Sequence, residues 1–201
     1  MQGLFHYSSL LRLTSLALFV LLLTGCGVNN IPTYDEEVTA SWSQVLNQYQ
    51  RRAELVPNLI ATVKGYAAHE KEVLTEVVEA RAKVGQMQLP DNILSNPQAF
   101  QEFQASQDAL SSALSRLLVV VERYPDLKAN QNFLTLQSQL EGTENRIAVA
   151  RRDYIHAVKR YNTELRTIPG RWWREFLYPE SELRENFTVA EDVQQVPKVE
   201  F

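Results

Sequence analysis

Residues able to bind a metal or to catalyse a reaction are few in this sequence. The 201 residues include three His and one Cys. His69 and Glu70 begin like a zinc-protease helix, but the second His of that motif would stand at position 73, which is Val73. A di-iron bundle requires two Glu-x-x-His pairs, and the nearest pattern here is Asp153 with His156. We therefore expect no metal site and no cofactor.

Other catalytic arrangements are also missing from the sequence pattern. Ser, His and Asp occur separately, without a nucleophile elbow or a glycine-rich phosphate loop, and the whole chain has seven Gly. We predict that the protein is not an enzyme. A single Cys excludes an intramolecular disulfide and a multi-thiolate zinc site. The formal net charge of -4 and the pI of about 5.5 argue against a nucleic-acid partner, because phosphates attract clustered positive charge.

The first 25 residues have the layout of a secretory signal peptide. Arg12 supplies a basic start, and residues 13–23 are an uncharged apolar stretch, shorter than the roughly 20 residues that a membrane span needs. Residues 23–26, Leu-Thr-Gly-Cys, resemble the bacterial lipoprotein signal, in which the Cys receives a diacylglyceryl group. An ordinary signal peptide or a short signal anchor is the alternative.

The lipoprotein interpretation predicts how the chain is attached. Residues 1–25 would be removed, Cys26 would carry fatty acyl chains such as palmitate, and residues 26–35 would form a tether. Two or three acyl chains hold a protein on a bilayer without a spanning helix. The body would then face outside the cytoplasm. Because Gly27 rather than Asp follows Cys26, the outer membrane is favoured if the cell is Gram-negative.

From about residue 35 the apolar side chains recur with a helical period. Two interleaved rows at seven-residue spacing form one stripe, which predicts an amphipathic helix of about 50 residues. The rows are Val38, Val45, Leu59, Tyr66, Val73 and Ala80, and Trp42, Tyr49, Val56, Val63, Val77 and Val84. Pro57 lies inside this helix without an N–H to donate, so the helix either kinks there or breaks into two.

Turn residues and prolines divide the rest of the body into two further helices. Residues 85–96 read as a loop, with Asn96 as the N-cap of a helix that ends before Pro125. The last long helix spans about residues 127–166 and is closed by Pro169 and Gly170. The sequence predicts an all-α, up-and-down antiparallel bundle over residues 36–169, with three long helices, or four if the first breaks at Pro57.

Residues 170–201 form an aromatic-rich extension that becomes polar. Trp172 and Trp173 open it, and the segment from Glu180 onward has no strong pattern. The two Trp side chains are expected to cap the end of the bundle, with contact to lipid as the alternative, because aromatic rings favour the bilayer interface.

Four polar residues stand out as candidates for a buried polar cluster or a binding site. Arg52 and Glu70 occupy places in the apolar rows of the first helix, about 27 Å apart along a continuous helix, so they cannot pair with each other. Gln107 is the one polar residue in the apolar row of the second helix. Counting from the turn at Pro125 places it near Glu144 on the third helix. These residues either fix the register of the helices or bind a ligand, and register is the expected role.

Two stretches of the chain carry a family resemblance. The first comprises residues 51–59 and 63–70 and is followed by Ala80-Arg81-Ala82. The second comprises residues 121–130 and is followed by Phe133, Leu136 and residues 140–147 and 150–154. Together they resemble the LemA family over residues 38–169. The chain departs from the family pattern in having Ile155 after Tyr154 where Asn is usual, and the Cys26 signal where members carry a spanning segment.

The resemblance implies a bacterial envelope protein with a helical bundle and an N-terminal membrane attachment, and it implies no reaction. Members tend to be encoded beside membrane proteases or other envelope proteins, which suggests an adaptor. We therefore expect a lipid-anchored, non-enzymatic scaffold or adaptor that binds another envelope protein. The alternative is a carrier of a lipid or small anionic ligand held between the helices near Arg52 or Glu70.

Overall fold

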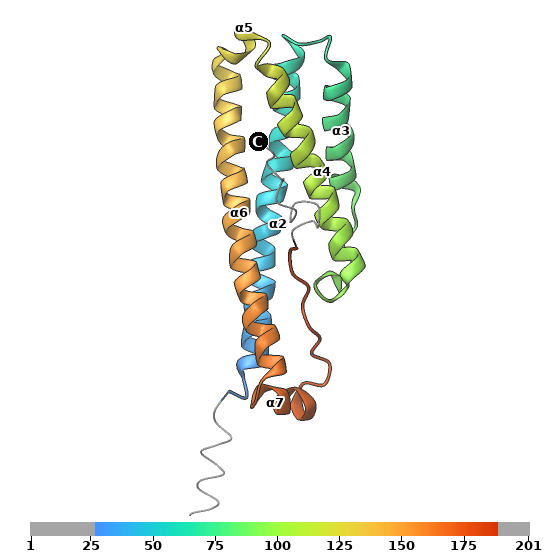
Figure 1. The fold of residues 1–201 in the computed structure, drawn as a ribbon, viewed down its shortest axis with the longest axis vertical. Coiled ribbons are helices and arrows are strands. Elements are labelled where there is room, and N and C mark those ends of the chain that lie inside the picture. The colour runs from blue at the N-terminus through green and yellow to red at the C-terminus, as the bar shows by residue number, and fades with distance from the viewer. Residues whose placement is uncertain (1–26, 189–201) are drawn as a thin grey trace, which may run out of the picture.

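The computed structural model describes residues 27–188, and all regular elements in this range are helical (Figure 1). The predicted lipidation residue, Cys26, and the predicted signal peptide lie outside the described residues. The elements, in chain order, are α2 (Asn30–Lys64), α3 (Lys71–Gln86), the short 3-10 helix η1 (Ile93–Ser95), α4 (Pro97–Val121), α5 (Pro125–Lys128), α6 (Gln131–Arg166) and α7 (Gly170–Leu177). No helix in the described range combines the length and apolar character needed to cross a bilayer.

Helix α2 begins inside the segment predicted to be a tether. It starts at Asn30, because Ile31 is buried in the bundle and the Asn30 amide donates to Glu164 Oε1 on α6 over 3.2 Å. Pro32 falls in the first turn, where a missing backbone N–H costs nothing. The packed body therefore starts within a few residues of Gly27.

The first long helix breaks, but not at Pro57. Helix α2 continues through Pro57 to Lys64, and the chain turns at residues 65–70 before α3 begins. The Tyr66 and Ala67 amides both donate to Val63 O, and Ala67 is fully buried, so the chain folds back at this point. The bundle has four long helices, as one of the two predictions had it, with the break eight residues beyond the predicted position.

The remaining helix boundaries follow their caps. Asn96 caps α4 as predicted, with its side-chain oxygen accepting from the Ala99 amide over 3.2 Å. Helix α4 ends at Val121, and α6 starts at Gln131, four residues later than predicted, because α5 intervenes. Asn130 then caps α6 by accepting from the amides of residues 132 and 133.

The bundle interior consists of two stacked cores. We call the one beside the start of the described chain the proximal core; it contains Trp42, Tyr49, Phe100, Phe103 and Tyr154 among its buried residues. The distal core, at the other end, is built from α2, α3, α4 and α6. Helix α3 follows the distal half of α4, so the proximal half lacks a fourth long helix (Figure 1).

The extended segment of residues 181–188 covers the proximal core together with Ile93 and Leu94 of the α3–α4 connection. It runs back along the bundle from α7 (Figure 1), and the Phe187 ring packs against Trp42, Phe100 and Tyr154 at centroid distances of 6.2, 5.0 and 5.5 Å. The Tyr154 hydroxyl donates to Glu185 O over 2.7 Å. Residues 181–188, for which the sequence showed no strong pattern, therefore pack as part of the fold.

Candidate functional site

The side chain of Arg52 joins three helices at the boundary between the two cores. It is 1% exposed and extends from α2 toward α4 and α6. Its Nη1 donates to Ser111 Oγ over 2.7 Å and to Glu144 Oε1 over 3.1 Å. Its Nη2 donates to Gln107 twice, to the main-chain oxygen over 3.0 Å and to Oε1 over 2.7 Å. We call Arg52, Gln107, Ser111 and Glu144 the Arg52 layer.

The charge of Arg52 is compensated inside this layer. Glu144 is its counter-ion and is 39% exposed, so one end of the ion pair remains hydrated while the guanidinium is buried. The Tyr49 ring lies 5.0 Å from the guanidinium carbon, close enough for a cation–π contact. Burial raises the pKa of the Tyr49 hydroxyl, and the positive charges of Arg151 and Arg52 partly oppose that shift.

The structure brings three of the four predicted polar residues together. Gln107 and Glu144 lie on facing helices, as counting from the turn indicated, and both accept hydrogen bonds from Arg52. One guanidinium on α2 thus hydrogen-bonds to both α4 and α6. The role in helix register stays a prediction.

Glu70 is separate from the Arg52 layer. Its predicted place on the apolar stripe assumed an unbroken first helix, and the turn at residues 65–70 moves it to the start of α3. There Glu70 Oε1 accepts from the Tyr124 hydroxyl over 2.8 Å and from Arg123 over 3.1 Å. The hydrogen bond with Glu70 raises the pKa of Tyr124. Glu70 thus ties the α2–α3 turn to the end of α4.

The polar groups of these clusters are mostly hydrogen-bonded within the protein. The hydrogen-bonding groups of Arg52 face protein oxygens, except Nε, which has no partner among the described residues. A guanidinium enclosed in this way positions helices rather than presenting its charge to an anion. In residues 27–188 no cluster of three or more His, Cys, Asp or Glu side chains is placed to hold a metal ion.

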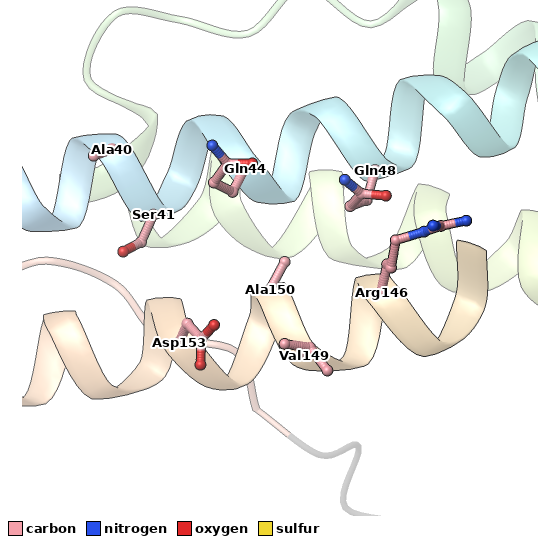
Figure 2. Close-up of a pocket in the computed structure, with 8 residues that line it drawn as sticks. All are labelled: Ala40, Ser41, Gln44, Gln48, Arg146, Val149, Ala150 and Asp153. Atoms are coloured by element: carbon pink, nitrogen blue, oxygen red, sulfur yellow. The ribbon is translucent and has the colours of Figure 1, made fainter. Parts of the chain in front are cut away.

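An open groove that sequence reasoning missed lies between α2 and α6. Its volume is about 420 Å³, and Figure 2 shows residues from both helices facing it. Small side chains leave the groove open, and amide and charged side chains stand around them. The lining residues are Ala40, Ser41, Gln44, Gln48, Arg146, Val149, Ala150 and Asp153.

The groove carries opposite charges at two places along α6. Arg146 lies beside Gln48 and Asp153 lies nearer Ser41 (Figure 2), about 10 Å apart along the helix axis. The buried Gln48 Oε1 has no hydrogen-bond partner in the described part of the chain. Val149, 46% exposed, adds apolar surface. The signal for this groove in the sequence is a set of small and amide residues that recur along α2 at spacings of three and four.

A smaller cavity of about 260 Å³ lies near the Arg52 layer, where α3 ends. It is mostly apolar, and the side chains of Tyr49 and Gln107 reach both the cavity and the layer. Its other lining residues are Leu46, Gln50, Ala53, Val84, Gly85, Met87, Leu89 and Phe103.

The fold and the site define an antiparallel helical bundle organised around a buried arginine, with a polar groove on its outer side. The sequence model described as the LemA family matches residues 41–201. The chain belongs to the LemA family, and the resemblance stated from its motifs is confirmed. The match extends through residues 170–201, so the C-terminal segment is included in it.

Named relatives agree with this assignment. The chain is 27% identical to magnetosome proteins MamQ 1 and MamQ 2 of Paramagnetospirillum magneticum, over 84% of this chain and 67% of each relative. It is 23% identical to protein LemA of Metamycoplasma hominis, over 70% of this chain and 60% of that protein. None of these names states a reaction.

Proposed function

We propose that this LemA-family protein is a lipid-anchored scaffold that binds another envelope protein in the groove between α2 and α6. The observation that carries the proposal is the groove itself, which is open, elongated and lined by both helices (Figure 2). Anchoring rests on the lipoprotein-type sequence ending at Cys26, and facing outside the cytoplasm follows from that signal.

The groove chemistry defines the partner segment. A segment with an acidic residue facing Arg146 and a basic residue facing Asp153 would match both charges in one orientation only. The pairing of Asp153 with Arg152 is exposed and 3.5 Å long, so it competes weakly. The amides of Gln44 and Gln48 offer both donors and acceptors, and Val149 offers apolar contact.

The position of the groove along the bundle restricts the partner further. Ala40 and Gln48 lie about 20 and 30 Å from Gly27 along α2, at a rise of about 1.5 Å per residue. While this chain is anchored through Cys26, a partner attached to the same membrane needs a segment that reaches this far from the bilayer. A membrane protein with an extramembrane segment of that reach fits the geometry.

Site-specific photocrosslinking in intact cells tests this proposal. A photoreactive residue at Gln44, inside the groove, should capture one discrete envelope protein, and the same residue at Glu79, on the exposed face of α3, should not. Arg146→Glu should abolish the capture, whereas Lys83→Glu, the same charge change on α3, should leave it intact. Cys26→Ser should reduce capture, because anchoring concentrates both proteins at one membrane.

Two results would contradict the scaffold. Capture from Glu79 equal to that from Gln44 would show that the groove is not the binding surface. Crosslinks only to a second copy of this chain would replace the adaptor with a self-associating protein.

The apolar cavity beside the Arg52 layer favours one alternative function, a carrier of a lipid or small amphiphile. Its volume of about 260 Å³ is near the lower limit for ligand pockets, and the neighbouring guanidinium is already neutralised by Glu144. Ala53→Leu would fill the cavity. If anionic lipids raise the melting temperature of the native chain but not that of Ala53→Leu, the carrier is supported; no copurifying ligand and no shift would exclude it.

A further inference from the structure

Helix α7 presents apolar side chains to solvent. Trp172 is 51% exposed and Phe176 is 74% exposed, and their spacing of four residues puts them on the same side of the helix. Ile168, just before α7, and Leu177, at its end, are also exposed. We call Ile168, Trp172, Phe176 and Leu177 the α7 face. Clustered exposed apolar groups of this kind mark contact surfaces.

The opposite side of α7 is fixed to the bundle, so this face cannot turn inward. Trp173 packs against the proximal core, as does Tyr178 at the end of the helix. Arg174 Nε donates to Ser181 O over 3.0 Å, which links α7 to the returning segment. The two sequence expectations for the tryptophans thus separate: Trp173 caps the bundle, and Trp172 is left exposed.

The α7 face lies at the end of the bundle where the described chain begins (Figure 1). Gly27 and Gly170 both approach Glu164: a Cβ on Gly27 would lie 3.8 Å from Glu164 Oε1, and one on Gly170 would clash with Glu164 O. The residue that would carry the lipid, Cys26, is bonded directly to Gly27. Consecutive Cα atoms are about 3.8 Å apart, so an acyl anchor would enter the bilayer beside α7.

We infer that the α7 face inserts into the headgroup boundary of the bilayer that holds the acylated Cys26. This inference rests on the lipid attachment proposed above. Trp and Phe rings favour that boundary, and an amphipathic helix lying in its plane buries its apolar side there. Arg171, which is exposed and precedes Trp172 in the sequence, adds a positive charge that lipid phosphates attract. The bundle would be held by two contacts instead of pivoting on its lipid.

A second copy of this chain fits the face poorly. Stable protein interfaces use about 20–30 residues per partner, and the α7 face offers four. Its position next to the start of the chain is explained by the membrane and not by self-association.

Tryptophan quenching by brominated lipids tests the insertion. The full chain, purified from membranes, is placed in phosphatidylethanolamine–phosphatidylglycerol vesicles, with bromine either absent or attached near the headgroup end of the acyl chains. The chain has three Trp, so single Trp→Phe variants identify each contribution. Native protein should lose emission in brominated vesicles. Trp172→Phe should remove most of that loss, while the buried Trp42→Phe and the half-buried Trp173→Phe should retain it.

The outcomes separate the insertion from the attachment. Mass spectrometry of the N-terminal peptide shows independently whether Cys26 is acylated. An acylated, vesicle-bound chain with equal emission in both vesicle types would overturn the insertion and leave the attachment standing. An unmodified Cys26 would overturn both. Shielding of Trp172 from aqueous iodide in the Cys26→Ser form, measured without vesicles or detergent, would assign the face to a protein contact and overturn the inference.

Discussion

At the scale of single residues, the contribution of Arg52 to stability depends on the shape of its guanidinium as well as on its charge. Two nitrogens donate to four oxygens on two other helices. A Lys at this position would keep the charge but could not satisfy these separated acceptors. We expect Arg52→Lys to lower the free energy of unfolding by about 2–4 kcal/mol, because buried oxygens lose their donors. Urea unfolding followed by circular dichroism measures this loss.

The adjacent Arg51 provides a matched control. It is exposed on α2, so Arg51→Lys should change the free energy of unfolding by no more than about 0.5 kcal/mol. Equal effects of the two substitutions would show that the Arg52 hydrogen bonds contribute no net stability.

The burial of Tyr154 should make the folded protein less stable at alkaline pH. Burial raises the pKa of its hydroxyl above the ordinary value of 10.0. Above about pH 10 the unfolded chain therefore releases this proton while the folded chain keeps it, so stability present below that pH declines as the pH rises. Tyr154→Phe should make the decline above about pH 10 less steep, with the remainder due to other buried tyrosines such as Tyr49. It should also cost about 1 kcal/mol at neutral pH through the lost bond to Glu185 O. Unchanged steepness in the variant would contradict this assignment.

At the scale of elements, the segment of residues 181–188 acts as a fourth wall of the proximal core. Phe187 is 9% exposed, whereas Phe176 on α7 is 74% exposed. Phe187→Ala should therefore lower the free energy of unfolding by about 3 kcal/mol or more, and Phe176→Ala, without membranes, by at most about 0.5 kcal/mol. Chemical unfolding of both variants measures the difference, and similar losses would mean that the segment does not support the core.

The sequence predicted elements well where the pattern was local. The all-α class and the Asn96 cap depend on periodicity and capping chemistry, and the structure confirms both. The break at Gly65 was hidden because α3 resumes the apolar rows after the turn and faces the same core. Residues 181–188 could not be predicted, since one buried aromatic in a polar stretch has no period and its partners lie far away in the chain.

The sequence also predicted only the local part of the candidate site. Gln107 and Glu144 could be paired by counting from one turn, because antiparallel neighbours keep a fixed register. Arg52 reaches them across a second interface whose register depends on the break after α2, and a sequence pattern does not contain that information. The groove between α2 and α6 was not predicted, because it lies at the edge of the contact between the two helices, where the buried Ala150 meets exposed polar side chains. The pattern of one helix does not locate such an edge.

At the scale of the whole molecule, the Arg52 layer separates two cores that are closed by different elements. Helix α3 packs on the distal core, and residues 181–188, with Ile93 and Leu94 of the α3–α4 connection, pack on the proximal core. Helices α2, α4 and α6 cross the layer and connect the two. This division suggests that each half opens on its own more easily than the whole protein unfolds, as contiguous cooperative units do.

Native-state hydrogen exchange on a reciprocal pair of variants tests the division. Phe187→Ala weakens the proximal core, so amides of the first half of α4 should exchange faster while those of α3 keep their protection. Leu117→Ala removes a fully buried side chain of the distal core and should produce the opposite pattern. If the bundle opens as one unit across the Arg52 layer, either substitution should accelerate the slowest amides of both halves together. Observing this pattern for either variant would contradict the division into two halves.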